Sequence, residues 1–202
     1  VFLHFGAANY RASIYLNGLL VGEHEGGFTP FNFDVSEGLH AGENLLVVMV
    51  DNRRGADDVP TPMTDWHNYG GLTREGSVLR VPEGFVRSWQ IGLSADGSRI
   101  EGWVDPVGIE VGAAVELAVP ELGIEESFAV GTDGRAVVSV EALPERWSPE
   151  NPKLYDVELR AGGDRVRDRI GFRTIAVEGG EILLNGEPIF LRGISIHEER
   201  PL

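Results

Sequence analysis

Cysteine is absent from the 202-residue sequence, and this absence removes several kinds of chemistry at once. Disulfide bonds, thiolate metal sites and cysteine nucleophiles are excluded, and no disulfide framework indicates a compartment. Long apolar runs are also missing, since none approaches the about 18 residues that a membrane helix needs. No segment of ten or more residues repeats its apolar residues with the 3.6-residue period of an α-helix. The sequence therefore predicts neither a membrane span nor a helical domain.

Basic residues are scarce, with 17 Lys and Arg against 32 Asp and Glu and a net charge of −15. Nucleic-acid binding requires a basic footprint on the phosphates, and the same charge disfavours an anionic membrane surface. We therefore expect neither nucleic acid nor membrane as a partner, and we interpret the charge as an aid to solubility. The five His residues show no short metal-ligand spacing, and the carboxylates of the 51–65 loop match no EF-hand pattern. We expect no metal and no cofactor.

Glycine and proline, with 27 and 11 residues, divide the chain into short runs rich in Val, Ile, Leu, Phe and Tyr. Asn17-Gly18 and Asn185-Gly186 each lie between two such runs. Asn-Gly favours a tight type I′ hairpin because it tolerates positive φ at both central positions. The Asp-Gly pairs at 96–97 and 133–134 give the same expectation. Short strands spaced by about 8–12 residues are typical of β-sandwiches, so we predict an all-β chain.

Two segments suggest domain boundaries. VLRVPEGF, residues 78–85, joins two sets of strands through Pro-Glu-Gly, and RTIAVEGGEILLNG, residues 173–186, begins a new hairpin. The block between them, 83–177, has the length of one immunoglobulin-like β-sandwich, about 100 residues. The block 1–82 is short for an eight-stranded jelly roll, so we expect its N-terminal strands to be missing. The block 178–202 is a hairpin followed by one apolar strand.

Four stretches spread over the chain carry a family pattern. They are YLNGLLVGEHEGGFTPFNFDV, MTDWHNYGGLTREGSVL, ERWSPENPKLYDVEL and DRIGFRTIAVEGGEILLNGEPIFLRGISIHEE. Together they resemble family 2 glycoside hydrolases, the group of β-galactosidases, β-glucuronidases and β-mannosidases. The resemblance implies a partial jelly-roll sugar-binding domain at 1–82 and an immunoglobulin-like β-sandwich at 83–177. It also implies that 178–202 is the entry hairpin and first strand of a truncated (β/α)8 barrel, the domain that holds the family's active site.

The final residues GISIHEERPL place an imidazole and two carboxylates directly after an apolar run. Side chains at the C-terminal ends of barrel strands face the active site. The resemblance therefore implies that His197 lines the sugar pocket of the intact enzyme, whereas the residues alone favour a surface histidine at a strand end. Glu198 matches the family motif, and we group it with His197 as a substrate-binding candidate that orients its neighbours. Glu199 is expected to be solvated.

Glu198 and Glu199 make a poor catalytic pair. A retaining glycosidase places two carboxyl groups about 5–5.5 Å apart beside the scissile bond, whereas successive residues of an extended chain point to opposite faces. The resemblance implies an acid/base Glu that follows an Asn, and no Asn-Glu pair occurs in the sequence. We therefore expect no catalytic residue in this chain, with the acid/base and nucleophile Glu downstream of Leu202.

The second candidate site is the stretch TDWHNYGGLTR. Aromatic rings suit the C–H face of a sugar, and amides or carboxylates suit its hydroxyls. The resemblance implies that this loop reaches the active-site mouth and that Asp65 contacts substrate there, with Asn68 a weaker candidate. The alternative is a loop that only packs between domains, with Trp66 and Tyr69 as apolar plugs. Arg74 is expected to anchor the loop.

Two functional hypotheses remain. The first is the non-catalytic N-terminal portion of a retaining exo-β-glycosidase, β-galactosidase-like or β-glucuronidase-like, whose partner is a terminal β-glycoside. The isolated chain is then expected to be inactive. The alternative is a stand-alone carbohydrate-binding or structural β-sandwich module without catalysis. Open apolar strand edges invite association, so we also expect a homo-oligomer or strand-mediated self-association of the isolated chain.

Overall fold

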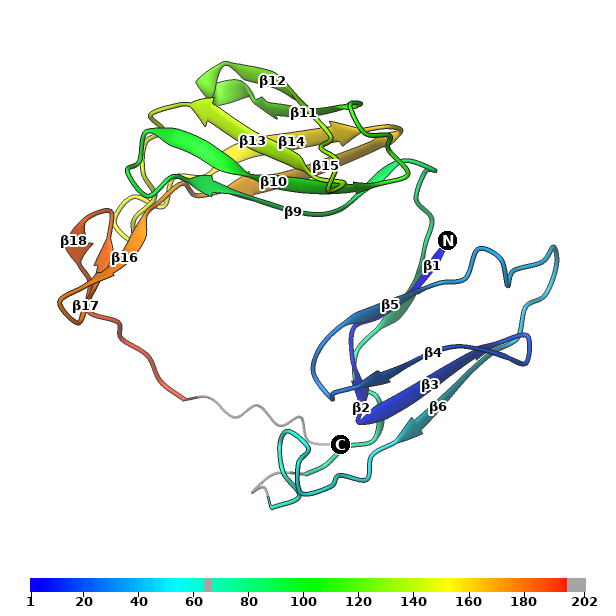
Figure 1. Ribbon diagram of the computed structural model, residues 1–202. Helices are drawn as coiled ribbons and strands as arrows, with labels where there is room; N and C mark the ends of the chain where they lie inside the picture. Colours follow the sequence, from blue (N-terminus) through cyan, green and yellow to red (C-terminus); the bar gives the residue numbers. More distant parts are fainter. Residues whose placement is uncertain (64–66, 196–202) are drawn as a thin grey trace. The chain divides into compact units, whose positions relative to one another are not determined.

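The computed structural model of the chain describes residues 1–63 and 67–195, and the chain divides into two compact units, Val1–Val81 and Pro82–Leu202. The described residues are almost entirely strands and loops, and their single helix is the short 3₁₀ turn η1, Pro120–Leu122 (Figure 1). The prediction of an all-β chain is therefore confirmed. Within the described residues, no helix has the length and apolar character needed to cross a membrane.

The described residues of the first unit form eight strands. They are β1 (Phe2–Phe5), β2 (Ala8–Asn9), β3 (Arg11–Leu16), β4 (Leu19–Glu25), β5 (Phe31–Asp34), β6 (Leu46–Asp51), β7 (Gly71–Leu72) and β8 (Gly76–Leu79). One sheet has the order β5-β1-β8, a second has the order β4-β3-β6, and β2 pairs with β7. All of these pairings are antiparallel.

The core of this unit follows from the two-residue period of its strands, because successive side chains point to opposite faces. In β1, Leu3 and Phe5 are buried, whereas Phe2 and His4 remain partly exposed. Both three-stranded sheets contribute to one apolar cluster, so they pack as two layers. Its buried members are Leu3, Phe5, Ala8, Ala12, Ile14, Leu16, Phe31 and Val35.

The Asn-Gly turns form as predicted, whereas the Asp-Gly turns do not. Asn17 and Gly18, between β3 and β4, have φ angles of 52° and 84°, so both central residues are left-handed as expected for Asn-Gly. Asn185 and Gly186 behave in the same way, with φ angles of 56° and 88°. The Asp-Gly prediction is wrong in detail, because only the glycine of each pair has positive φ. At 97 the Gly N–H donates instead to the carbonyl of Ser94 across a longer turn.

Seven of the described strands of the second unit form two sheets. They are β9 (Phe85–Leu93), β10 (Arg99–Val107), β11 (Ala114–Val119), β12 (Ile124–Ala129), β13 (Ala136–Glu141), β14 (Tyr155–Ala161) and β15 (Asp164–Ile170). Their sheets have the orders β13-β10-β9 and β12-β11-β14-β15. Side chains from both sheets enter one buried cluster, so this unit is a β-sandwich. The fully buried large members are Phe172, Ile100, Leu117, Leu159, Val104, Val115, Val119 and Val138.

Aromatic side chains close the end of this sandwich beyond β15. Phe172 is fully buried, and its ring centroid lies 5.6 Å from that of Tyr155. The Tyr155 hydroxyl accepts a hydrogen bond from the backbone N–H of Glu145 at 2.9 Å, and the backbone N–H of Trp147 donates to the Phe172 carbonyl at 2.8 Å. The segment before β14 is therefore fixed to the segment after β15 by packing and hydrogen bonds together.

Three short strands follow, β16 (Ile175–Glu178), β17 (Glu181–Leu184) and β18 (Glu187–Pro188), paired in that order. The hairpin expected from Asn-Gly is present, but the apolar strand expected after it is not. Residues 189–195 form no strand, and Phe190 and Ile194 are each 84% exposed. A strand obtains its backbone hydrogen bonds from a neighbour. No strand of the described residues pairs with 190–195, which explains the difference.

Candidate functional site

Most of the predicted site residues lie outside the part of the chain that the structure describes. Asp65 and Trp66 fall in the gap at 64–66, and His197, Glu198 and Glu199 fall in 196–202. Asn68, Tyr69 and Arg74 are described. The candidate site therefore consists of the loop residues around Asn68 and the residues of the first unit that contact them.

Three asparagines from separate segments meet at this loop. Asn68 is exposed, and its Nδ2 donates to the Asn52 carbonyl at 2.6 Å, while Asn52 Nδ2 donates to the Asn68 carbonyl at 3.1 Å. On its other side, Asn68 Oδ1 accepts a hydrogen bond from Asn9 Nδ2 at 2.9 Å. Asn9 Nδ2 also donates to the Tyr69 carbonyl. Asn68 is thus joined by its side chain to both the end of β2 and the residue after β6.

Asn9 is the buried member of this set, with 4% of its surface exposed. A buried amide must have hydrogen-bond partners, because leaving them unmade costs about 1–3 kcal/mol. Its Oδ1 accepts from Arg54 Nη2 at 3.2 Å, and Gly27 leaves the space that this oxygen occupies. A Cβ at Gly27 would lie only 2.6 Å from Asn9 Oδ1. The glycine of the GGF turn therefore has a packing role here.

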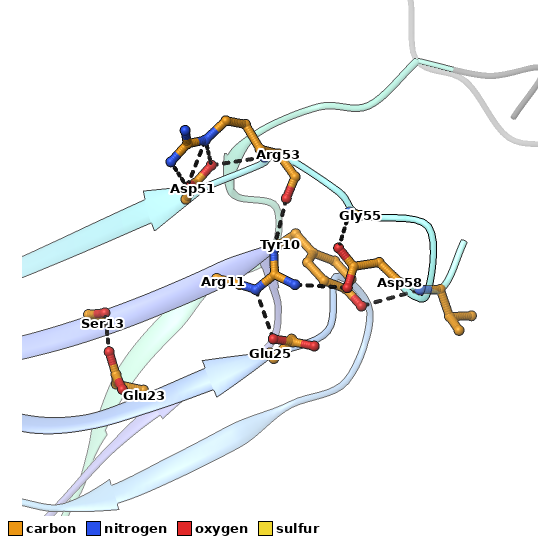
Figure 2. Close-up of polar contacts among 10 residues, drawn as sticks. Tyr10, Arg11, Ser13, Glu23, Glu25, Asp51, Arg53, Gly55 and Asp58 are labelled. Carbon is orange, nitrogen blue, oxygen red and sulfur yellow. Dashed lines mark hydrogen bonds and ion pairs between the residues drawn. The ribbon is translucent and has the colours of Figure 1, made fainter. Parts of the chain in front are cut away.

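Arg11 of β3 fixes the loop that follows β6 (Figure 2). Its Nε donates to Glu25 Oε2 at 2.8 Å, and its Nη2 donates to Asp58 Oδ1 at 2.8 Å. Its Nη1 reaches the Arg53 carbonyl at 3.1 Å. Asp58 Oδ2 in turn accepts the Gly55 N–H at 2.5 Å. Residues 53–58 are thereby bound to the β3–β4 hairpin through one guanidinium.

Two further contacts complete this anchor. The Val59 N–H donates to the Tyr10 hydroxyl at 3.2 Å, which extends the attachment beyond Asp58 (Figure 2). Asp51 accepts hydrogen bonds from Arg53 Nε at 3.0 Å and from Arg53 Nη2 at 2.5 Å. These bonds lower the pKa of Asp51 to about 2. Asp51 and Asp58 therefore both form ion pairs with arginines. This cluster is suited to holding a loop rather than to proton transfer.

The exposed surface of the loop offers aromatic and polar groups. Tyr69 is 47% exposed, and its ring centroid lies 5.7 Å from that of the exposed His67. Phe28, from the GGF turn, is 58% exposed. Arg74 Nη1 donates to the Phe28 carbonyl at 3.1 Å, so Arg74 anchors the loop as expected. Rings and amides of this kind can contact the apolar faces and hydroxyls of a sugar.

No group of three or more His, Asp or Glu among the described residues could hold a metal ion. Asn9 and Asn52 are the residues that the sequence analysis missed. Neither belongs to a recognisable motif, and they are separated from Asn68 by 59 and 16 residues. Only the folding of β2 and β6 against β7 brings the three side chains together.

The chain matches two family models. Residues 1–82 match the sugar binding domain of glycosyl hydrolases family 2, and residues 110–173 match a second model of glycosyl hydrolases family 2. The chain belongs to glycosyl hydrolase family 2. The resemblance drawn from four sequence stretches is therefore confirmed, and the loop cluster lies within the part that matches the sugar binding domain.

Relatives of this family 2 chain are β-galactosidases and β-glucuronidases. It is 33% identical to a β-galactosidase of Arthrobacter sp. (strain B7) over 198 residues, which is 97% of this chain and 19% of that protein. Among solved structures, it matches Lactobacillus rhamnosus β-glucuronidase with a TM-score of 0.77 and 30% identity, over 99% of this chain and 37% of that one. Bifidobacterium dentium β-glucuronidase complexed with coumarin-3-O-glucuronide gives a TM-score of 0.77 and 26% identity, over 93% and 38%. The chain thus spans well under half the length of these relatives.

Proposed function

We propose that the chain is the non-catalytic N-terminal portion of a retaining exo-β-glycosidase, β-galactosidase-like or β-glucuronidase-like, that hydrolyses terminal β-linked sugars. The observation that carries this proposal is the match to the Arthrobacter β-galactosidase, which extends over 97% of this chain and only 19% of that protein. The arginine-bound carboxylates of the loop cluster also favour a binding role over acid–base catalysis.

The proposed domains are a partial jelly roll at 1–82 and an immunoglobulin-like sandwich at 83–177. Residues 178–202 are proposed as the entry hairpin of a (β/α)8 barrel and the segment that forms its first strand in the intact enzyme. The match of 1–82 to the sugar binding domain supports the first assignment. The immunoglobulin-like assignment is supported by seven strands that form one sheet of three and one sheet of four. A constant-type immunoglobulin sandwich has the same strand numbers. The β16–β18 hairpin is compatible with the third assignment.

In this proposal the chemistry is a double displacement, in which one Glu acts as acid/base and another forms a covalent glycosyl intermediate. Both belong to residues beyond Leu202. The residues of this chain contribute to substrate binding, with Asp65, His197 and Glu198 as the proposed contacts. Asn68 lies at the same loop as Asp65.

An activity assay on two proteins tests the proposal. The 202-residue chain and the full product of the gene that encodes it are each assayed with aryl β-galactosides and aryl β-glucuronides. We expect hydrolysis by the longer protein and background rates from the chain alone. Hydrolysis by the isolated chain well above background, or no β-glycosidase activity in the longer protein, would contradict the proposal.

Calorimetric titration of the isolated chain distinguishes the alternative. A stand-alone carbohydrate-binding module would bind a mono- or oligosaccharide tightly and specifically without any partner domain. The proposed portion of an enzyme lacks most of its pocket walls, so we expect weak binding or none. Tight, specific binding would favour the module.

A further inference from the structure

Asn52 and Asn68 form a clasp at the base of the loop between them. Each side-chain amide donates to the other residue's backbone carbonyl, at 3.1 Å from Asn52 Nδ2 and 2.6 Å from Asn68 Nδ2. The two residues are 16 positions apart and stand on either side of the 53–67 segment. Closing both ends of a segment reduces the number of conformations available to what lies between them.

Asn9 attaches the clasp to the body of the first unit. Its Nδ2 donates to Asn68 Oδ1 at 2.9 Å and to the Tyr69 carbonyl. Both polar atoms of the Asn68 amide are consequently engaged by protein groups, the oxygen by Asn9 and the nitrogen by Asn52. This arrangement suits a residue that holds its own segment better than one whose amide is directed at a sugar.

A glycine makes room for the clasp. A Cβ at Gly70 would lie 2.9 Å from Asn52 Nδ2 and 3.0 Å from Asn52 Cβ. Gly70 does not have a positive φ, so its role is to leave space rather than to adopt a special backbone conformation. An alanine at this position would displace the Asn52 amide and would add no group that could contact substrate.

We propose that Asn9, Asn52 and Asn68 are positioning residues that fix the segment from His67 to Tyr69 for sugar binding. Asn68 contributes through this clasp and not by direct contact with the sugar. The inference rests on the proposed function, because the segment it fixes belongs to the loop assigned to substrate binding. Holding a binding segment in advance removes the cost of ordering it when the ligand arrives.

Kinetics of the full gene product test this role through Asn52, whose side chain is directed at the Asn68 backbone. Asn52→Ala is expected to raise KM about fivefold, the effect of one ordinary hydrogen bond, with kcat nearly unchanged. Gly70→Ala should also raise KM, because its added Cβ would displace the Asn52 amide. Because both bonds close the same segment, Asn52→Ala combined with Asn68→Ala should raise KM by less than the product of the two single effects.

Asn44→Ala is the matched control. Asn44 Nδ2 donates to the carbonyls of His40 and Gly42, and its Oδ1 accepts from Asn17, so its removal also opens a loop of the first unit. The expected result is a lower melting temperature with unchanged KM. If Asn68→Ala raises KM while Asn52→Ala leaves KM unchanged, Asn68 contacts the sugar directly, and the inference is wrong. Equal changes of KM in Asn44→Ala and Asn52→Ala would show a general loss of stability.

Amide hydrogen exchange on the 202-residue chain separates this inference from the proposed function. Asn52→Ala should accelerate exchange at Tyr69 and its neighbours, whereas Asn44→Ala should leave these amides unchanged. If the full gene product proves inactive, the proposed function fails, and the exchange pattern still decides whether the clasp orders the segment. Unchanged exchange in Asn52→Ala would overturn the inference.

Discussion

Arg11 Nη2 lies 2.8 Å from Oδ1 of Asp58, a carboxylate whose side chain is only 8% exposed. The same guanidinium bonds Glu25, whose side chain is 56% exposed. One arginine therefore has a buried carboxylate on one side and a solvated carboxylate on the other. The difference matters because water weakens an exposed ion pair, whereas a buried carboxylate depends on its protein partners.

Asp58→Ala is expected to destabilise the first unit by about 1–3 kcal/mol, since the Gly55 N–H and Arg11 both lose their acceptor. Glu25→Ala, which removes the exposed partner of the same arginine, should cost less than about 1 kcal/mol. Urea denaturation of the two variants measures the difference. Equal costs for the two substitutions would mean that burial of Asp58 does not govern this contact.

Gly171→Ala is expected to destabilise the second unit by about 1–3 kcal/mol through overpacking. The added Cβ would lie 2.7 Å from Cδ1 of Trp147, whose backbone N–H donates to the Phe172 carbonyl. Gly92→Ala in β9 is the matched control, because nothing lies within 4 Å of its added Cβ, and its cost should stay within about 0.5 kcal/mol. Thermal melts of both variants test this, and a neutral Gly171→Ala would contradict the packing argument.

Acid should weaken the turn that holds Asp96. The Ser94 hydroxyl, the Ser98 N–H and the Ser98 hydroxyl donate to this carboxylate and lower its pKa to about 2, with Ser94 the largest cause. A pKa depressed by folding stabilises the protein above the ordinary value of 3.8, and this stabilisation is lost as the pH falls toward 2. Asp96→Asn should therefore be less stable than the wild type at pH 6, with a difference that narrows below pH about 4.

Denaturant titrations at a series of pH values between neutrality and about 3 measure the free energy of unfolding. The difference between the two proteins should begin to narrow near the pKa of an unfolded aspartate, about 3.9. The wild type and Asp96→Asn are compared at each pH. A stability difference that stays constant over the series would mean that the charge of Asp96 has no part in the turn.

The β6 edge should drive self-association of the isolated chain. β6 pairs with β3 on one side only, and no other described strand pairs with its second edge. Val47 and Met49 of this strand are 47% and 56% exposed. A lysine on an open edge opposes strand pairing, so Val47→Lys should lower the association seen in light scattering. Val111→Lys, at a 61% exposed position outside the strands, should not.

A wild-type chain that remains monomeric at high concentration would remove the basis for this prediction. Equal loss of association in Val47→Lys and Val111→Lys would also count against it, because the effect would then not depend on the β6 edge.

Features that depend on local chain preferences could be predicted from the sequence. Asn17-Gly18 and Asn185-Gly186 form turns with positive φ at both positions because Asn and Gly tolerate that region wherever they occur. The all-β architecture followed from short β-branched and aromatic runs between turn residues. Family membership followed from four stretches whose order does not depend on knowing the fold.

Features that depend on a distant partner were decided by the tertiary structure alone. Residues 189–195 have the composition of a strand but form none, because no described strand supplies backbone hydrogen bonds to 190–195. Asn68 was predicted as a sugar contact from its loop, yet both polar atoms of its amide are bound by Asn9 and Asn52. Hydrogen bonds between residues 16 and 59 positions apart exist only after β2, β6 and β7 have packed, so their partners cannot be predicted from the sequence around Asn68.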